Sequence, residues 1–114
     1  MNIETANKIL AKACGIEYSV TDGGVVLYDG DGYGFRDYKW TISDARVREV
    51  VRERFEIETR VNYANFGEVL KKYWKSTGVS VDKRFHGKGR TIAEAELACM
   101  IKIAEQLGES DVNK

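Results

Sequence analysis

Residues 91–108 have the sequence TIAEAELACMIKIAEQLG, the strongest helical pattern in the chain. Thr91 and Glu94 have the spacing of a capping box, in which each side chain accepts a hydrogen bond from an otherwise unpaired backbone amide. We expect the helix to end at Gly108. Apolar residues cover far more than one narrow stripe of its surface, and they include Ile92, Ala95, Leu97, Cys99, Met100, Ile101, Ile103, Ala104 and Leu107. The width of this apolar face predicts a helix that is central to the core or shared with a second subunit.

Two further amphipathic helices are predicted nearer the N-terminus. Residues 3–14 carry apolar side chains at helical spacing, and Asn2 is placed to cap their start. A second helix follows Ser43 or Asp44, either of which can serve as its cap, and ends near Phe55. Both helices would present one apolar face to a common core.

Alternation of apolar and polar residues predicts the β structure. Residues 16–28 are expected to form a hairpin, because glycine and aspartate separate two short apolar runs. Residues 55–63 alternate strictly and predict a strand. The apolar residues of 66–74 suit a short helix ended by Gly78, and residues 79–85 suit a further strand.

These elements predict one small α+β domain. The chain has 114 residues, a usual size for a single domain, and contains no proline. We expect a small antiparallel sheet covered by about three to four helices over residues 1–108, followed by a flexible tail at 109–114. No stretch approaches the roughly 20 apolar residues of a membrane-spanning helix or the pattern of a signal peptide, so we expect a cytoplasmic protein without membrane contact.

Composition argues against several kinds of chemistry. Lysine plus arginine equal aspartate plus glutamate at 18 each, so direct nucleic-acid binding ranks below protein or small-ligand binding. Cys14 and Cys99 are too few and too distant for a disulfide framework or a zinc motif, and we expect them to be reduced core residues. His86 is the sole histidine and has no companion ligands at fixed spacing. No catalytic residue, metal or cofactor is predicted, and we expect a protein that is not an enzyme.

A basic loop with two glycines leads directly into the last helix. It has the sequence HGKGRT at residues 86–91. Free amides and the helix dipole at such a point favour an anion, which makes the loop a candidate phosphate site. The candidate ligands are Lys88, Gly89, Arg90 and Thr91. The alternative is a solvated connection in which the glycines form the turn and the threonine only caps the helix.

The most individual loop lies at residues 29–38, where three glycines precede a cluster of aromatic side chains. Aromatic residues and arginine are over-represented in binding hot spots. The candidate interaction patch consists of Tyr33, Phe35, Arg36 and Tyr38. The alternative is that alternate members of this run are core anchors of a strand that starts near Phe35.

Three short segments at or beside the predicted helices carry a family resemblance. They are ANKILA at residues 6–11, WTISD at 40–44 and TIAEA at 91–95. In their order and pattern they resemble the phage ABA-sandwich family of small bacteriophage accessory proteins, whereas the middle of this chain is longer and more charged than that family's pattern. The resemblance implies a phage or prophage gene acting in the host cytoplasm. It carries over no catalytic residue.

Two functions of different classes stay open at this point. The first is a non-catalytic accessory protein that binds and blocks a host protein, for example a component of CRISPR or another defence system. The second is a small-ligand binder that sequesters a phosphorylated nucleotide signal through Lys88 and Arg90. An unrecognised enzyme and a DNA-binding module are further alternatives, against which stand the lack of a nucleophile–base pair and the neutral net charge. We also expect a homodimer formed through the wide apolar face of the last helix.

Overall fold

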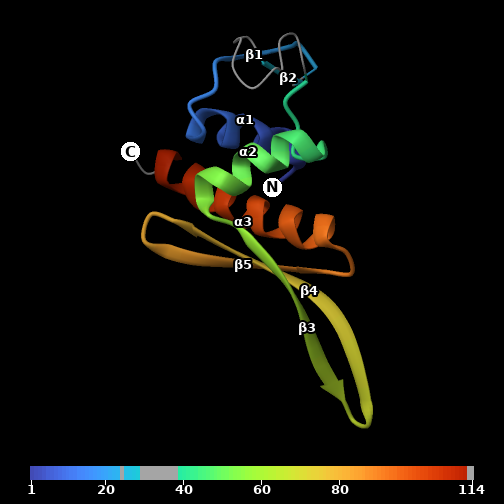
Figure 1. Cartoon of the computed structure of the whole chain (residues 1–114). Coiled ribbons are helices and arrows are strands. Elements are labelled where there is room, and N and C mark those ends of the chain that lie inside the picture. The colour runs from blue at the N-terminus through green and yellow to red at the C-terminus, as the bar shows by residue number, and fades with distance from the viewer. Residues whose placement is uncertain (24, 29–38, 113–114) are drawn as a thin grey trace.

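A computed structural model describes residues 1–23, 25–28 and 39–112, with only the backbone described for residues 28 and 109–112. The elements in chain order are α1 (Ile3–Ala13), β1 (Tyr18–Val20), β2 (Val26–Tyr28), α2 (Ala45–Phe55), β3 (Glu58–Phe66), β4 (Val69–Ser80), β5 (Lys83–Gly89) and α3 (Ile92–Val112). Strands β1 and β2 form one small antiparallel sheet, and β3, β4 and β5 form a second in that order. All three of these helices lie on one side of the second sheet (Figure 1). The predicted α+β fold class is confirmed.

The helix starts follow the predicted capping chemistry. Asn2 accepts a hydrogen bond from the backbone amide of Thr5 at 2.8 Å, and Asp44, rather than Ser43, accepts one from the amide of Arg46 at 2.8 Å. Each bond satisfies one of the amides that the first helical turn leaves unpaired. The predicted hairpin over residues 16–28 is also confirmed, with Tyr18 paired to Tyr28 across β1 and β2.

The predicted helix over residues 66–74 is wrong, because these residues belong to a long β-hairpin. Phe66 of β3 pairs with Val69 of β4 across a two-residue turn, in which Gly67 has a φ of 66°. Glycine adopts this left-handed conformation without steric cost, so the chain reverses there. The apolar spacing of this segment fits a helix equally well, and only pairing with β3 decides the matter.

The single strand predicted over residues 79–85 is likewise corrected, to two strands joined by a turn. Val79 belongs to β4 and Phe85 to β5. Between them Val81 and Asp82 both have positive φ, 50° and 62°. Two such residues in succession form the turn whose twist matches that of a hairpin.

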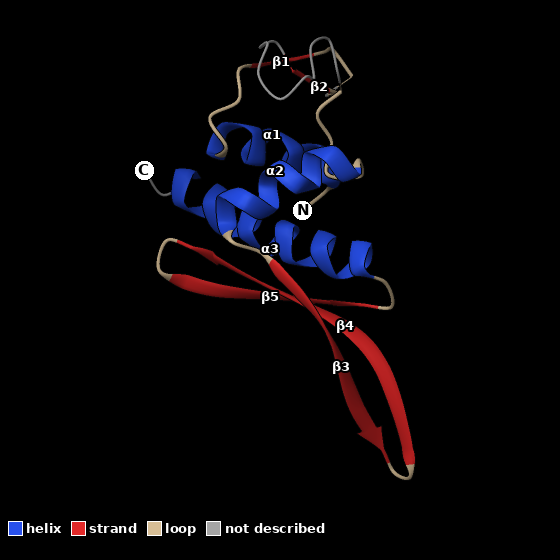
Figure 2. Cartoon of the chain, viewed as in Figure 1, coloured by secondary structure: helices blue, strands red, loops and turns tan. Residues whose placement is uncertain are grey.

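Helix α3 lies between the second sheet and the pair α1 and α2 (Figure 2). It therefore has apolar neighbours on opposite sides, which accounts for the width of its apolar face. Met100, at the centre of the face expected to be shared with a second subunit, is fully buried within one chain. The helix continues past Gly108 to Val112 instead of ending at the glycine. The homodimer stays a prediction. The fully buried part of this face, which includes Met100, is not available for contact with a second subunit.

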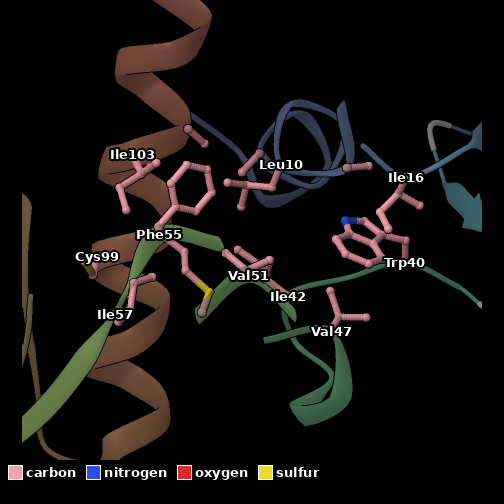
Figure 3. Close-up of a cluster of buried hydrophobic side chains, with 14 of the residues drawn as sticks. Leu10, Ile16, Trp40, Ile42, Val47, Val51, Phe55, Ile57, Cys99 and Ile103 are labelled. Carbon is pink, nitrogen blue, oxygen red and sulfur yellow. The ribbon is translucent and has the colours of Figure 1, made fainter. Parts of the chain in front are cut away.

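One hydrophobic core joins the helices to the base of the second sheet (Figure 3). Phe55 and Ile57 bring the end of α2 against α3, while Leu10 and Trp40 fill the space toward β2. The core includes Ala6, Leu10, Ala11, Ile16, Val26, Trp40, Ile42, Val47, Val51, Phe55, Ile57, Cys99, Met100, Ile103 and Ala104. Because this cluster draws on every helix, the helices share one contiguous core.

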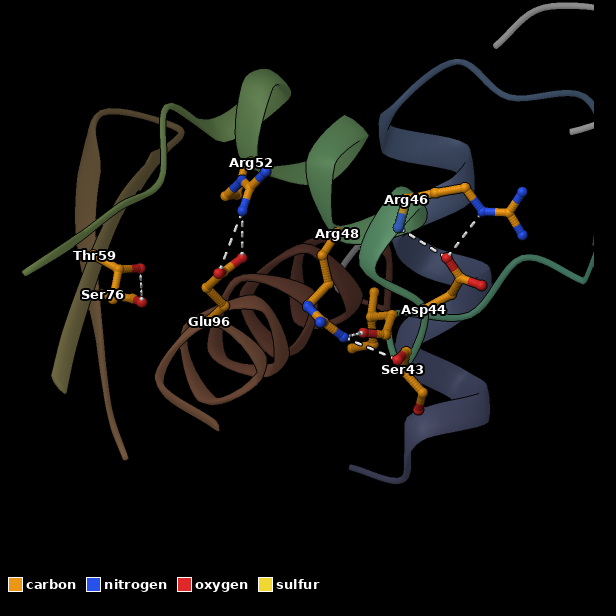
Figure 4. Close-up of polar contacts among 9 residues, drawn as sticks. Ser43, Asp44, Arg46, Arg48, Arg52, Thr59, Ser76 and Glu96 are labelled. Atoms are coloured by element: carbon orange, nitrogen blue, oxygen red, sulfur yellow. Dashed lines mark hydrogen bonds and ion pairs between the residues drawn. The ribbon is translucent and has the colours of Figure 1, made fainter. Parts of the chain in front are cut away.

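One ion pair joins α2 to α3, and two hydrogen bonds hold the segment that leads into α2 (Figure 4). Buried Glu96 of α3 forms an ion pair with Arg52 of α2 at 3.3 Å. Arg48 donates to the backbone carbonyl of Ile42 at 3.0 Å and to that of Ser43 at 2.9 Å. The ion pair gives the buried carboxylate of Glu96 a partner, and Arg48 gives one to the carbonyl of buried Ile42.

The hairpin of β3 and β4 projects beyond the rest of the molecule (Figure 1). Strand β5 pairs with β4 only from Trp74 onward, so the outer part of the hairpin is a two-stranded ribbon. We call residues 62–73 the arm. Its apolar side chains are largely in solvent, with Phe66 64% exposed and Leu70 60% exposed.

Replacing Gly87 with alanine should destabilise the protein by at least about 2 kcal/mol. A Cβ at this position would lie 2.5 Å from the carbonyl oxygen of Ala95 and would also clash with the backbone nitrogen of Cys99. Both atoms belong to the α3 backbone, so the helix itself must move. Urea unfolding measures the loss.

The matched control is Gly23→Ala. A Cβ on Gly23 would meet nothing within 4 Å, so we expect a change within about 0.5 kcal/mol. Equal stability of the two variants would contradict the close contact between β5 and α3.

Candidate functional site

The second sheet has one face against the helices and one face open. Gly87 and Ser76 are buried against α3, and strand alternation places their neighbours Lys75 and Lys88 on the opposite side. None of the described elements covers that side (Figure 2). We call it the open face. Its residues are Glu58, Arg60, Asn62, Ala64, Phe66, Val69, Lys71, Tyr73, Lys75, Thr77, Val79, Arg84, His86 and Lys88.

Three cations form a row across the open face. Arg60 of β3 is the register partner of Lys75 in β4, and Lys75 is the partner of Lys88 in β5. Like charges directly opposite each other on neighbouring strands destabilise a sheet. Of these three cations, only Arg60 has an ion pair within the described part of the chain, to Glu58 at 3.4 Å, and both of those side chains are mostly exposed. The positive charge of the row is therefore largely not neutralised by carboxylates of the described residues.

Charge is divided between the second sheet and the rest of the chain. Residues 58–90 contain eight lysines and arginines against three aspartates and glutamates, a net charge of +5. The remaining residues contain ten against fifteen, a net charge of −5. The two parts cancel, so the neutral total conceals a basic sheet. A field of one sign over one face attracts ligands of the opposite sign.

A hollow of about 640 Å³ lies between the arm and the connection from β5 to α3. Aromatic rings and cations alternate around it. The ammonium group of Lys88 lies 5.6 Å from the ring centroid of Tyr73, and that of Lys71 lies 5.7 Å from the centroid of Phe66. The lining residues are Ala64, Phe66, Lys71, Lys72, Tyr73, Lys88, Gly89, Arg90 and Glu94.

Of the four residues predicted to bind an anion, Lys88, Gly89 and Arg90 line the hollow. Thr91 does not line the hollow and instead caps α3: its hydroxyl oxygen accepts a hydrogen bond from the amide of Glu94 at 3.1 Å. The carboxylate of Glu94 accepts from the amide of Arg90 at 2.7 Å, one residue before the expected partner. A carboxylate of the chain itself thus occupies one amide at the start of α3. Glu94 also lines the hollow, so one negative charge lies among the cationic side chains there.

Sequence reasoning missed the contribution of β4 to the hollow. Lys71, Lys72 and Tyr73 fall within the segment predicted as a helix, where their register with β5 is not visible. The available signal was Gly67 followed by a single residue between two apolar runs, the pattern of a tight hairpin turn. The predicted patch of Tyr33, Phe35, Arg36 and Tyr38 lies outside the described residues.

The two cysteines are poorly suited to nucleophilic chemistry. Burial raises the pKa of the Cys14 thiol from 9.0 to about 11, with nearby Arg54 acting in the opposite direction. Burial likewise raises the pKa of Cys99 to about 11, against the influence of Lys102. The thiolate is the reactive form, so both groups are mostly unreactive near neutrality. Within the described residues no three metal-binding side chains are grouped to hold an ion.

Comparisons with known proteins found no matching family model, no similar curated protein and no similar solved structure. In the part of the chain that the structure describes, no helix is both long enough and apolar enough to cross a membrane. The function must therefore be argued from the open face and the hollow themselves.

Both thiols should react slowly with a disulfide reagent at pH 8 in the folded protein. A pKa raised by two units lowers the thiolate fraction roughly 100-fold, and unfolding in urea should restore ordinary reactivity. Because the folded-state pKa exceeds the unfolded one, this contribution to stability is complete below pH 9 and is lost as the pH rises through 11. Reaction at the same rate with and without urea would contradict the burial of both thiols.

Proposed function

We propose that this chain is a non-catalytic binding protein whose ligand carries phosphate groups. The observation that carries the proposal is the row of Arg60, Lys75 and Lys88 on a face that no described element covers. Such a row costs folding stability, and an anionic ligand offsets that cost. The adjoining hollow supplies further cations and aromatic surface to the same ligand.

The hollow has the chemistry of a nucleotide site. Its volume of about 640 Å³ falls within the range of small-ligand pockets. Lys71, Lys88 and Arg90 bring positive charge from two strands and a connecting segment, while Tyr73 and Phe66 present ring surface. Cations favour phosphate, and aromatic rings favour the face of a base. This combination supports binding of a phosphorylated nucleotide-type ligand.

The phage resemblance gives the binding a biological setting. A small accessory protein that holds a phosphate-bearing ligand withholds it from a host system without performing chemistry. We propose this withholding role in the host cytoplasm, where such a ligand is available to defence or signalling proteins. The role requires affinity and does not require a catalytic group.

Tripolyphosphate should bind the wild-type protein, and the double variant Lys75→Gln with Lys88→Gln should bind it at least tenfold more weakly. A charge-assisted phosphate contact is worth about 1.5–3 kcal/mol, and tenfold corresponds to about 1.4 kcal/mol. Isothermal titration calorimetry at low salt measures the affinity. Removing two facing charges should also leave the thermal midpoint unchanged or raise it, because cross-strand repulsion falls.

The matched control is Lys8→Gln with Lys102→Gln, which removes the same charge from exposed positions on α1 and α3. This control should bind tripolyphosphate almost as the wild type does. Equal losses in both double variants would mean a general charge effect and no site on the open face. Absence of any binding by the wild type would reject the proposed function.

A second candidate function is the blocking of a host protein, and the arm favours it. Phe66 is 64% exposed and Leu70 60%, and Tyr63 and Val69 extend this apolar surface around the ribbon. Exposed apolar groups gathered on a projecting element are typical of protein–protein contacts. Lysines 71 and 72 flank the tip and reduce unspecific pairing of the strand edge.

If the arm blocks a host protein, the tagged chain should retain that protein stoichiometrically from a bacterial lysate. The variant Phe66→Thr with Leu70→Thr should lose it, because both apolar contacts disappear. The control Val79→Thr changes an exposed apolar residue outside the arm and should retain it. Native mass spectrometry of the recovered complexes measures retention by the wild type, the arm variant and the control. Retention that is unaffected by the arm variant would contradict this function.

A further inference from the structure

The cationic surface is larger than one small ligand requires. Lys75 and Arg60 lie on the open face but do not line the hollow. Arg84 and His86 continue the surface along β5 in the direction away from Lys88. With about 3.4 Å per residue, Lys71 to Lys75 spans about 14 Å of β4, and Arg84 to Lys88 spans a similar length of β5. Charge distributed over such lengths suits a chain of phosphates.

Rings alternate with cations along the same track. Lys71, Tyr73 and Lys75 lie on one face of β4 at successive intervals of about 7 Å. Tyr73 is half-buried beside Lys88, and Phe66 stands exposed beside Lys71. Aromatic rings beside cations are the components of single-strand binding surfaces, where bases stack on rings and the backbone follows the charges. Every base has a stacking face, so this arrangement does not depend on base sequence.

The rings distinguish a single strand from a duplex. In a duplex each base is stacked on its neighbours, and a protein reaches only phosphates and groove edges. The rings of Tyr73 and Phe66 would then have no base to stack on. A single strand offers free base faces together with its phosphates, and it uses both parts of the track.

We infer that the ligand of the open face is single-stranded nucleic acid, which lies along β4 with phosphates on Lys71, Lys75 and Lys88 and a base on Tyr73. This inference rests on the proposed function, since it needs the open face to bind phosphate. The neutral net charge does not argue against this ligand, because the basic sheet and the acidic remainder cancel in the total. The inferred ligand is a polynucleotide strand that contacts the whole open face, whereas a mononucleotide would contact only the hollow.

The test uses the full chain and a fluorescein-labelled 12-mer of deoxythymidylate, followed by fluorescence anisotropy. Unlabelled competitors are an abasic 12-mer, thymidine triphosphate and a 12-base-pair duplex. The thymidylate 12-mer should compete at least about fivefold better than the abasic one, because a stacked base adds to the phosphate contacts. The thymidylate 12-mer should also compete better than thymidine triphosphate and better than the duplex. Equal competition by the abasic 12-mer, or stronger competition by either of the other two, would overturn the inference.

Two variants locate the contact. Tyr73→Leu keeps an apolar side chain of similar bulk and should weaken thymidylate binding at least about fivefold, with tripolyphosphate binding unchanged. Tyr63→Leu is the matched control, since Tyr63 lies on the other face of the arm opposite Lys72 and should change the affinity less than twofold. Equal effects of the two variants would overturn the placement of the base on Tyr73.

Salt dependence separates this inference from the proposed function. Each phosphate contact with a single strand contributes about 0.7 to the slope of log affinity against log salt. Lys75→Gln with Lys88→Gln should therefore lower the slope by about 1.4, whereas Tyr73→Leu should leave it unchanged. An unchanged slope in the lysine variant would place the strand elsewhere. Failure of tripolyphosphate and all oligomers to bind would reject the proposed function itself, whereas tripolyphosphate binding without base preference would reject only the inference.

Discussion

The contact on which the structure depends is the close approach of β5 to the backbone of α3. Gly87 and Gly89 have no side chain, and any Cβ there would collide with helix backbone atoms. This approach seats α3 directly on the sheet and leaves its other side for α1 and α2. Once the helices occupy one face, alternation sends the lysines of β4 and β5 to the opposite face. The geometry of the core thus determines where the cations gather.

Local chemistry explains which elements could be predicted from the sequence. The caps at Asn2 and Thr91 depend on neighbouring residues, and the hairpin of β1 and β2 depends on a short turn, so both were visible in the sequence. Strand β4 was not visible, because its outer half lies in an arm exposed on both faces and has no buried side to impose alternation. Its apolar spacing matched a helix by coincidence. Pairing with β3 supplies the information that the segment itself lacks.

The candidate site likewise has a part that local sequence predicted and a part that only strand pairing reveals. Lys88 and Arg90 were identified because glycines and a capping threonine mark their segment in the sequence, although residues 86–89 form the end of β5 and not the predicted loop. Lys75, Lys71 and Tyr73 join them only through cross-strand register, which no window of the sequence contains. Net charge misled in a similar way, since a sum over the chain cannot report that positive residues share one face. Position in the sheet, more than composition, brings the residues of the proposed site together.

The row of like charges lowers the stability of the sheet, and the proposed binding function gives that cost a role. A sheet selected only for stability would place carboxylates opposite Lys75, yet its register partners are Arg60 and Lys88. The rest of the chain, residues 1–57 and 91–114, carries an acidic excess of five, so carboxylates were not lacking in composition. The rigid contact between β5 and α3 and the apolar core offset the repulsion, and they hold the cations together without a ligand. Under the proposed function, a surface that the core already holds in place loses little further order on binding, which favours affinity for a ligand as mobile as a phosphate chain.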